Sequence, residues 1–292
     1  MPDPGPFILG AGSAGLGLSL ALADRGVPLR GMWNRRETPN LREFSTRSLG
    51  PIFSGPLHEG DEGLKEAVRS SSPVILAVSD DAIEEVARAL HTNDMLTPHT
   101  LLVHLSGCLT SEVLRGGFDP RSASFHPLAA CPTPAATRAT LPNAFFTLEG
   151  GELALPVLEG LVKSLGGTSK TIQAAQKKRY HASAVLASNL MVALLAVAGD
   201  EAAGIGLDDL EEPLARLAIG ALERALESGT QRGLTGPLVR GDLATIAQHL
   251  EALSPAGEAA YRLLSHRALK LVPPTELSPG TRAELDALLT GD

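Results

Sequence analysis

The fold of this chain is decided by the stretch "FILGAGSAGLGLSLALADRG", which runs from Phe7 to Gly26. Apolar residues typical of a buried strand come first, and Gly10, Gly12 and Gly15 follow them in the spacing G-x-G-x-x-G. Apolar residues at helical spacing then continue to Gly26, where a helix is expected to end. Together these features predict the first βα unit of a dinucleotide-binding fold. The alternative is a structural glycine turn in an α/β fold that binds no nucleotide.

Each glycine has its own task in such a unit. Gly10 permits the tight turn, Gly12 lets the backbone approach a pyrophosphate, and Gly15 lets the helix pack close to the strand. Unpaired N–H groups and the helix dipole favour an anion at the N-terminus of the helix. The cofactor contacts expected in this segment are Gly10, Ala11, Gly12, Ser13, Ala14 and Gly15.

The end of the second strand predicts which dinucleotide is bound. An acidic residue at this place accepts hydrogen bonds from the ribose of NAD and repels a 2′-phosphate. The segment "MWNRRE" instead has Asn34, Arg35 and Arg36. A neutral amide and two guanidinium groups suit a phosphate, so the pattern favours NADP. The alternative is that Arg35 and Arg36 are only a solvated pair in a loop.

Short apolar runs alternate with amphipathic segments through the first part of the chain. Asp81–Leu90 and Glu152–Leu165, for example, have the helical pattern. Continuous apolar strands separated by helices indicate a mostly parallel sheet with both faces covered. The expected strands are Phe7–Leu9, Leu29–Trp33, Val74–Val78, Leu101–His104, Ser122–Phe125, Ala144–Leu148 and Thr168–Ile172.

From Gln173 onward only helical patterns remain. The fold class is therefore expected to be α/β, with a doubly wound, mostly parallel Rossmann sheet followed by an all-α C-terminal domain. We expect residues 1–173 to form an NADP-binding domain and residues 174–292 a helical domain for substrate binding and dimerisation. The expected helices run to about Gly199, over Asp209–Ser228, over Asp242–Leu253, from Ser254, and after Ser278.

Composition and charge narrow the class of partner. A net charge of -8 without a basic run argues against binding to nucleic acid or to an anionic membrane surface, so a small-molecule substrate is expected. Cys108 and Cys131 are the only cysteines, and their spacing suggests neither a disulfide framework nor a zinc site. The start "MPDPGP" lacks the basic and apolar regions of a secretory signal. We therefore expect a cytoplasmic protein.

The most apolar segment is Ala184–Gly199, "AVLASNLMVALLAVAG". It is shorter than the roughly 20 residues of a membrane span and is interrupted by Ser188 and Asn189. Because a helix of small, uncharged residues has no face suited to water, we expect it to be buried and to contribute to a homodimer.

Several segments resemble a known family of proteins. They are "ILGAGSAG", "WNRR", "VILAVSDDAI", "LLVHLSG", "ASFHPLAA" and "LTGPLVRGDLATIAQHLEAL". The chain resembles, from Phe7 to about Leu253, bacterial proteins proposed to be NADP oxidoreductases, in which a Rossmann-like domain precedes a helical domain of unknown function. It is similar in architecture to pyrroline-5-carboxylate reductase, ketopantoate reductase and the 6-phosphogluconate dehydrogenase superfamily. The resemblance implies the fold and the cofactor, but it implies no substrate.

The carboxyl ends of the strands are the expected place for the ligand. At the end of one strand we expect Val78, Ser79 and Asp80 to contact the cofactor, and the alternative for Asp80 is that it only caps the next helix. Ser106 and Gly107 resemble the Ser-Gly substrate loop of the 6-phosphogluconate dehydrogenase superfamily. A plain turn after the strand is the alternative for them.

Two histidines are the candidate proton donors. His126 follows an apolar strand and could titrate near neutral pH, although it could equally be a structural histidine. His181 and Ser188 are seven residues apart and would share one face of a continuous helix, with Asn189 beside them. Relatives in the superfamily use a lysine and an asparagine on the corresponding helix, where this chain has Lys177 and Lys178 one turn before His181.

We take His126, His181, Ser188, Asn189 and Ser106 as the candidate catalytic residues. His104, His126 and His181 could alternatively be read as a metal trio, but no close ligand pair supports that reading and we expect no metal. In the glycine-punctuated loop Ser228–Asp242, Thr235 and Arg240 are candidate contacts for an anionic group of the substrate, and Asp242 is expected to cap the next helix.

The sequence thus predicts an NADP(H)-dependent reductase or dehydrogenase acting on a C=O or C=N bond of a small metabolite. A deazaflavin coenzyme in place of NADP is an alternative within this class. The alternative from another class is a non-catalytic NADP(H)-binding sensor or partner-binding dimer. The two classes differ in whether a proton donor faces the cofactor.

Overall fold

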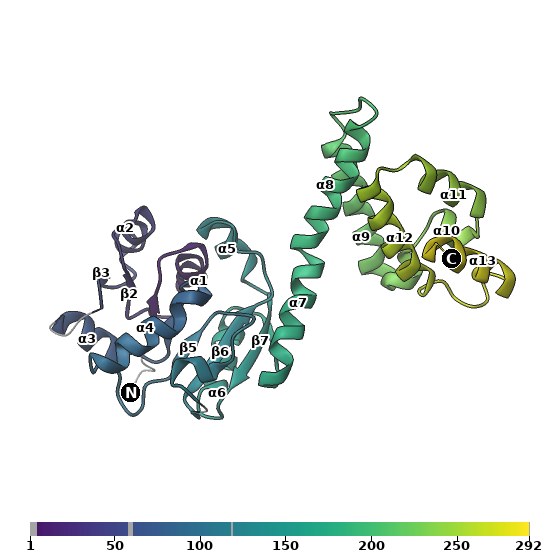
Figure 1. Ribbon diagram of the computed structural model, residues 1–292. Coiled ribbons are helices and arrows are strands. Elements are labelled where there is room, and N and C mark those ends of the chain that lie inside the picture. The colour runs from purple at the N-terminus through teal and green to yellow at the C-terminus, as the bar shows by residue number, and fades with distance from the viewer. Residues whose placement is uncertain (1–4, 58–60, 118, 292) are drawn as a thin grey trace. The chain divides into compact units, whose positions relative to one another are not determined.

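The structure is a computed structural model that describes residues 5–57, 61–117 and 119–291. It divides into two compact units, Met1–Val185 and Leu186–Asp292 (Figure 1). The division falls inside helix α7 (Lys177–Ala187), whereas the sequence-based boundary between residues 173 and 174 was placed where the strands end. The first turns of α7 therefore belong to the same unit as the sheet.

The first unit is built on one sheet with the strand order β3-β2-β1-β4-β5-β6-β7-β8. All neighbouring strands pair in parallel except β6 and β7, which pair antiparallel, so the predicted mostly parallel Rossmann sheet is confirmed. The strands are β1 (Phe7–Leu9), β2 (Gly31–Asn34), β3 (Ile52–Ser54), β4 (Val74–Leu76), β5 (Leu102–His104), β6 (Ser122–Pro127), β7 (Phe145–Gly150) and β8 (Thr168–Thr171).

Strand β3 escaped the sequence analysis for a physical reason. It is an edge strand of three residues, and Ile52 and Ser54 are exposed. Such a strand has no continuous apolar run to distinguish it from a loop. The buried strands were found by their apolar residues, and the exposed edge strand β8 was found from the segment Thr168–Ile172.

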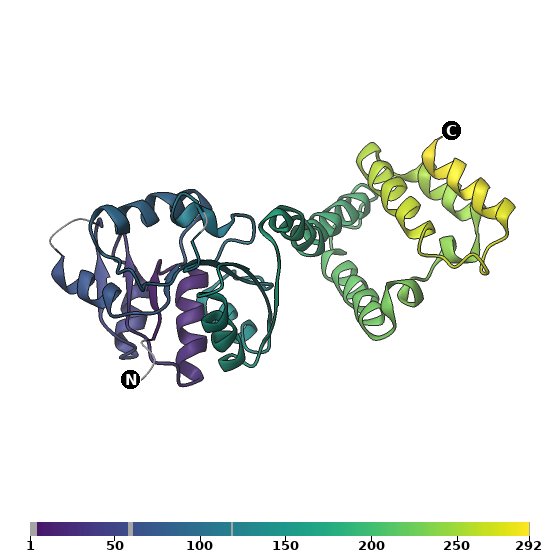
Figure 2. The same cartoon turned by 90° about the horizontal axis from the view of Figure 1, so that it is seen from below.

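Helices cover the two faces of the sheet because successive strand residues point to opposite sides. Ile8 packs into one core with α1, α2 and α6, whereas Phe7 and Leu9 pack into a second core with α3 and α4 (Figure 2). The helices of this unit are α1 (Ser13–Asp24), α2 (Pro39–Thr46), α3 (Glu62–Arg69), α4 (Asp80–Thr92), α5 (Pro134–Thr140), α6 (Leu155–Ser164) and the start of α7, with short 3₁₀ helices at Ser111–Leu114 and Ala174–Gln176.

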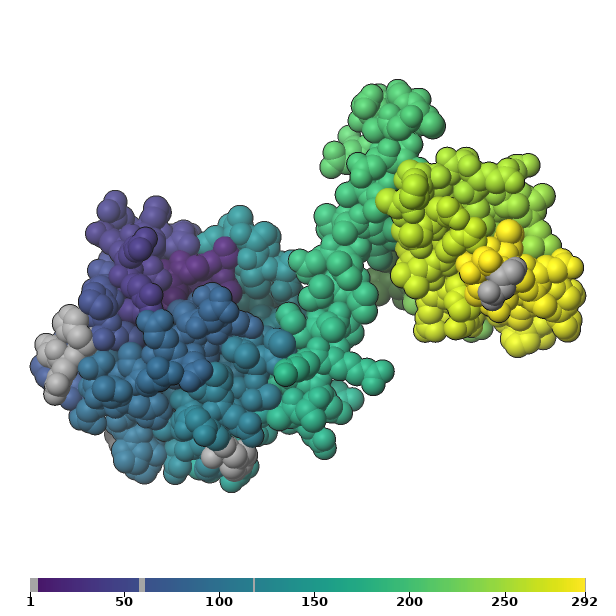
Figure 3. All heavy atoms as spheres, viewed as in Figure 1, coloured from purple at the N-terminus to yellow at the C-terminus, as the bar shows by residue number. Residues whose placement is uncertain are grey.

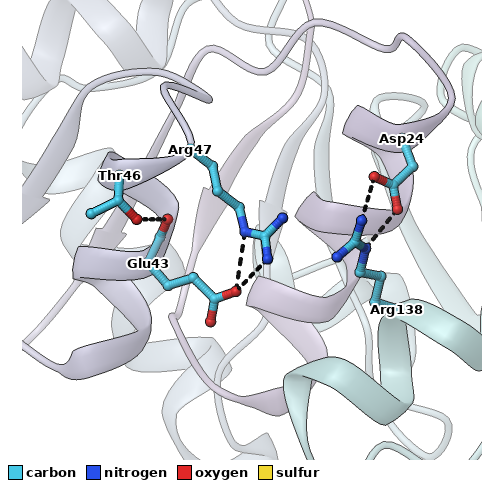
Figure 4. A network of polar contacts seen from close by, with 5 residues as sticks. All are labelled: Asp24, Glu43, Thr46, Arg47 and Arg138. Atoms are coloured by element: carbon cyan, nitrogen blue, oxygen red, sulfur yellow. Dashed lines mark hydrogen bonds and ion pairs between the residues drawn. The ribbon is translucent and has the colours of Figure 1, made fainter.

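Helix α5 packs directly on α1. A Cβ atom added at Gly17 of α1 would lie 2.4 Å from Cβ of Thr137, so a glycine is needed for this approach. At the end of α1, Asp24 accepts two hydrogen bonds from the guanidinium of Arg138, at 2.6 and 2.8 Å (Figure 4). Because this pair is half-exposed, the close packing at Gly17 contributes more to the attachment of α5 than the ion pair does.

The second unit is entirely helical, as predicted. Its core is formed by residues such as Leu238, Ile246 and Leu285. The predicted caps are confirmed: side chains of Asp242, Ser254 and Ser278 accept hydrogen bonds from backbone N–H groups of the helices that follow. The helices are α8 (Asn189–Ala203), α9 (Glu211–Gly233), α10 (Pro237–Arg240), α11 (Leu243–Ala252), α12 (Pro255–Leu269) and α13 (Pro279–Thr290).

The long apolar helix differs from the prediction in two ways. It is broken at Ser188, whose φ of −125° and ψ of −76° are not helical, and it becomes α7 and α8. No residue of α8 is buried in the single chain, and its green spheres lie at the surface in Figure 3. The prediction of a buried helix is therefore wrong for one chain by itself. Helix α8 packs mainly on α9 and α12, and apolar side chains such as Leu190 and Val192 stay exposed.

Candidate functional site

The glycine loop has the geometry of a nucleotide cradle. Gly10 has a φ of +116°, and a Cβ atom there would lie 2.3 Å from the carbonyl oxygen of Ala77. A Cβ atom on Gly15 would lie 1.9 Å from the carbonyl oxygen of Gly10, so both positions require glycine. A Cβ atom on Gly12 would meet no atom within 4 Å. Gly12 therefore leaves open space on the side from which a pyrophosphate approaches, as the motif predicts.

Two asparagines hold this loop in place. Asn34 accepts a hydrogen bond from the N–H of Ala11 at 3.2 Å and donates one to the carbonyl of Arg36 at 2.7 Å. Asn40, which the sequence analysis missed, donates to the carbonyl of Ala11 at 2.7 Å. Asn34 thus shapes the cradle in addition to its predicted place beside a 2′-phosphate. An asparagine one residue into a helix carries no sequence signal that would identify Asn40.

The two predicted phosphate-binding arginines have different surroundings. Arg35 forms an ion pair of 2.8 Å with Glu85 of α4, and both side chains are more than half exposed. Arg36 is exposed as well. A surface pair of this kind is worth little, so Arg35 is free to exchange its partner for a phosphate.

The N-terminus of α1 completes the cradle. Its N-cap is Gly12, so no capping side chain covers the N–H groups of the first turn. Ser13 donates to the carbonyl of Pro132 at 3.1 Å, which ties the loop before α5 to this end of α1, and Ala14 is half-buried beside it. Open N–H groups at the start of a buried helix fit the phosphates of a dinucleotide.

Asp80, which follows β4, connects the segment beside the glycine loop to the loop that follows β5. Val78 and Ser79 follow β4, and Val78 lies against the glycine loop. Asp80 is the first residue of α4, and its carboxylate accepts a hydrogen bond of 2.8 Å from Oγ of Ser106. Asp80 therefore positions the loop that follows β5.

The loop Ser106–Gly107 is fixed by every polar group of Ser106. The hydroxyl oxygen of Ser106 accepts from the N–H groups of Cys108 and Leu109, at 3.1 and 3.0 Å. Its own N–H donates to Nδ1 of His104 at 3.1 Å. Since this hydroxyl is already saturated, the geometry gives Ser106 the task of shaping the loop.

Lys177 of α7 anchors the same loop from the other side. Its side chain is 1% exposed, and its ammonium donates to the carbonyl oxygen of Ser106 at 3.0 Å and to Oγ of Ser124. Burial lowers the pKa of Lys177 to about 8. The sequence could not distinguish Lys177 from its exposed neighbour Lys178, because only the tertiary structure shows which lysine faces the sheet.

His104 is a structural histidine. Because Nδ1 accepts from Ser106, its proton sits on Nε2, which donates to the carbonyl of Thr110 at 3.2 Å. Burial, followed by the charge of Lys177, lowers the pKa of His104 to about 3, so the ring is neutral. Both ring nitrogens of His104 make hydrogen bonds, so neither is free for a metal ion bound by His104, His126 and His181. Within the described part of the chain, no three His, Cys, Asp or Glu side chains are placed to hold a metal ion.

His126 and His181 meet over Gly107. A Cβ atom on Gly107 would lie 2.5 Å from Nδ1 of His181 and 2.7 Å from Nε2 of His126. The two ring centroids are 5.7 Å apart, with the rings nearly perpendicular. Nδ1 of His181 is buried and has no hydrogen-bond partner among the residues that the structure describes. The fold thus brings the two predicted proton donors together at the carboxyl ends of β5 and β6.

The protonation state of His126 differs from the expectation. Burial, then the charges of Lys177 and His181, lower the pKa of His126 to about 4. The ring is therefore neutral at pH 7, although the sequence suggested titration near neutrality. Nδ1 of His126 lies 2.9 Å from the hydroxyl of Tyr180, a residue that the sequence analysis did not single out.

The remaining candidates lie in the second unit. Ser188 and Asn189 are exposed, and the hydroxyl of Ser188 donates to the amide oxygen of Asn189 at 2.9 Å. The expectation that His181 and Ser188 share one face of a continuous helix is wrong, because the helix ends before Ser188. Thr235 and Arg240 are also exposed.

The sheet order and the glycine loop define the class of fold: this is a Rossmann-like α/β unit followed by a helical unit. A family model described as a domain of unknown function, DUF2520, matches residues 144–268. Comparison with curated proteins finds no match.

Solved structures with the same fold include several oxidoreductases. A protein from Thermotoga maritima is 23% identical with a TM-score of 0.73, covering 91% of this chain and 98% of its own. A proposed NADP oxidoreductase from Bacteroides fragilis is 21% identical with a TM-score of 0.68, at the same coverage. At these identities the likeness shows the fold.

Two more distant structures have defined activities. A reductive aminase from Aspergillus terreus, solved with NADPH, is 16% identical with a TM-score of 0.55, covering 92% of this chain and 94% of its own. A pyrroline-5-carboxylate reductase from Coxiella burnetii is 15% identical with a TM-score of 0.57, covering 99% and 97%. The architectural resemblance predicted from the sequence motifs is confirmed.

Proposed function

We propose that this protein is an NADP(H)-dependent oxidoreductase that transfers a hydride to or from a C=O or C=N bond of a small metabolite. The observation that carries the proposal is that the open glycine cradle and the His126–His181 pair belong to the same carboxyl-end edge of one sheet. Ligands of doubly wound sheets bind at this edge. Proteins of similar fold include an enzyme that was solved with NADPH.

The residues present fit NADP rather than NAD. Gly12 leaves room for the pyrophosphate, and the N-terminus of α1 offers uncovered N–H groups. No carboxylate follows β2 directly; Asn34, Arg35 and Arg36 stand there. When bound, the cofactor supplies or accepts the hydride.

The side chains of the protein must then transfer the one proton that accompanies each hydride. His126 and His181 each have a ring nitrogen beside Gly107, and these are the groups we assign to proton transfer. Nε2 of His126 is its nitrogen beside Gly107. Because the ring is neutral at pH 7, it gives a proton to a substrate heteroatom there only as Nδ1 takes one up, so it relays a proton and does not store one as an imidazolium. Ser188, Asn189, Thr235 and Arg240 remain our candidates for orienting the substrate.

We also propose that the protein is a homodimer through α8 and α9. Large apolar side chains on these helices are exposed in the single chain, among them Val192, Leu217 and Leu226. By length and composition, the helical stretch Ala174–Ala203 could also cross a membrane. Two observations favour a second copy instead: the helix is interrupted at Ser188, and Lys177 near its start is buried against the sheet.

Turnover assays test the proposed activity. The purified protein is incubated with NADPH and a panel of small aldehydes, ketones and imines, and oxidation of NADPH is followed. We expect at least one substrate class to react, and either His126→Ala or His181→Ala to lower turnover by roughly 10²-fold with little change in NADPH affinity. NADPH binding without turnover on any carbonyl or imine would favour the sensor instead. Full activity in both variants would refute the assignment of the proton donor.

A further inference from the structure

We propose that Tyr180 is a positioning residue for His126: its hydroxyl donates to Nδ1 and thereby keeps the ring proton on Nε2, the nitrogen beside Gly107. The proposal rests on the proposed function, in which Nε2 of His126 faces the substrate. It assigns a task to a residue of α7 that the glycine motif and the histidines do not account for.

The contact is short and well oriented. The hydroxyl oxygen of Tyr180 lies 2.9 Å from Nδ1 of His126. The two ring centroids are 5.6 Å apart with an interplanar angle of 83°, so the phenol meets the imidazole at its edge. A hydrogen bond at one ring nitrogen of a histidine determines which nitrogen carries the proton.

A third residue of the group, Thr147, favours this direction of the hydrogen bond. Thr147 of β7 is the direct cross-strand partner of His126 in β6. Its hydroxyl oxygen is buried and makes no hydrogen bond to another described residue, but Thr147 is near enough to the phenol of Tyr180 to favour a lower pKa there. A buried hydroxyl seeks a partner. When the Thr147 hydroxyl turns its proton toward the phenol oxygen, the phenol proton is left for Nδ1 of His126.

The ionisation states agree with this direction. Burial raises the pKa of Tyr180, so the phenol keeps its proton at neutral pH. Burial lowers the pKa of His126, so the imidazole is neutral and one of its nitrogens has a free lone pair. A neutral phenol and a neutral imidazole form one hydrogen bond with one defined donor.

This hydrogen bond determines whether the nitrogen of His126 beside Gly107 carries a proton. With Nδ1 accepting from Tyr180, the proton of His126 is on Nε2, directed at the space beside Gly107. Nδ1 of His181, the other nitrogen at this glycine, is buried and makes no hydrogen bond within the described part of the chain. Nε2 of His126 is thus a hydrogen-bond donor beside Gly107, next to Nδ1 of His181. Without Tyr180, both tautomers and both ring orientations of His126 become accessible.

The chain contains a matched control pair in its second unit. The hydroxyl of Tyr261 lies 2.9 Å from Nδ1 of His249, with ring centroids 5.6 Å apart and an angle of 85°. This pair has nearly the same geometry as Tyr180 and His126 but belongs to the second unit. Tyr261→Phe therefore removes the same kind of hydrogen bond from a tyrosine to which we assign no part in the proposed reaction.

The test is nitrogen NMR on protein labelled with ¹⁵N-histidine, in the wild type and in Tyr180→Phe and Tyr261→Phe, with His126→Ala to assign the signals. In the wild type at pH 7 we expect His126 to be protonated on Nε2 only. In Tyr180→Phe we expect a mixture of tautomers and a turnover at least tenfold lower, with the NADPH affinity unchanged. Tyr261→Phe should alter the signals of His249 alone and keep full turnover.

The tautomer of the wild type decides the proposal even if Tyr180→Phe does not fold or no substrate is found. A proton on Nδ1 of His126 would mean that the phenol accepts, and would overturn it. An unchanged tautomer and full turnover in folded Tyr180→Phe would also overturn it. Absence of turnover in the wild type, with Nε2 protonated as expected, would count against the proposed function and not against the role of Tyr180.

Discussion

The ammonium of Lys177 donates a hydrogen bond to the carbonyl oxygen of Ser106 at 3.0 Å, although the two residues are 71 positions apart in the chain. The contact holds the first turn of α7 to the loop that follows β5. It also places a positive charge beside His104 and His126, and this charge lowers the pKa of both rings.

Removal of this charge should make His126 easier to protonate. We expect Lys177→Met to raise the pKa of His126 from about 4 toward its ordinary value, but not fully, because burial is the larger cause of the shift. Proton NMR titration of the imidazole measures the change. Lys178→Met is the matched control, since Lys178 is the exposed neighbour. An equal change in the pKa of His126 in both variants would show that the charge of Lys177 does not act on this ring.

The glycine cradle can be tested by comparing two substitutions of the same size. Gly12→Ala should leave the protein folded, because the added Cβ atom meets nothing within 4 Å, but should weaken NADPH binding at least tenfold, or about 1.4 kcal/mol. Gly15→Ala should destabilise the fold itself, because its Cβ atom would lie 1.9 Å from a carbonyl oxygen. Thermal unfolding and calorimetric titration separate the two effects. Unchanged NADPH affinity in Gly12→Ala would show that the pyrophosphate does not bind at this loop.

Cofactor selectivity should depend on the arginines after β2. We expect NADPH to bind at least tenfold more tightly than NADH, about 1.4 kcal/mol, and Arg35→Ala or Arg36→Ala to reduce the difference. Arg88→Ala is a suitable control, because Arg88 is an exposed arginine of α4 paired with Glu84. Calorimetric titration of the wild type with equal affinities for the two cofactors would refute the assignment.

Acid should destabilise the first unit through His104. Its folded pKa of about 3 lies below the ordinary 6.5, so the unfolded chain binds more protons between these values and stability falls as the pH falls through 6.5. We expect His104 to account for a loss on the order of 2 kcal/mol between pH 7 and pH 5. Denaturant unfolding followed by the fluorescence of buried Trp33 measures it.

In His104→Asn the amide oxygen can still accept from Ser106, so this part of the acid sensitivity should disappear while the loop contact is kept. His99→Asn, a change on an exposed histidine, is the control. The same pH dependence in wild type and His104→Asn would show that the buried ring is not its source.

The proposed dimer should depend on the exposed apolar side chains of α9. Leu226 is 89% exposed and Leu217 68% exposed in the single chain. We expect a dimer at micromolar concentration by light scattering, and a monomer after Leu217→Glu or Leu226→Glu, because a buried unpaired carboxylate costs several kcal/mol. Leu153→Glu changes an exposed leucine of the first unit and should leave the dimer intact. A monomeric wild type at high micromolar concentration would rule out the dimer.

The sequence by itself determined the class of fold, and the reason is local. The central strands β1 and β4 are continuous apolar runs, the glycine spacing follows a strand and opens a helix, and Asp242, Ser254 and Ser278 cap helices by contacts three residues away. Signals of this kind act within one turn or one strand, so the linear chain displays them. The edge strand β3, which lacks such a signal, was missed.

Only the tertiary structure decided the chemistry of the candidate site. It selected Lys177 over Lys178, brought His126 and His181 together at Gly107, and set Tyr180 beside a neutral imidazole. The pKa of His126 depends on burial and on a charge from another segment, and neither is visible in the residues around it. Solvation and electrostatic effects depend on distances in space, which are set when strands and helices far apart in the chain come together.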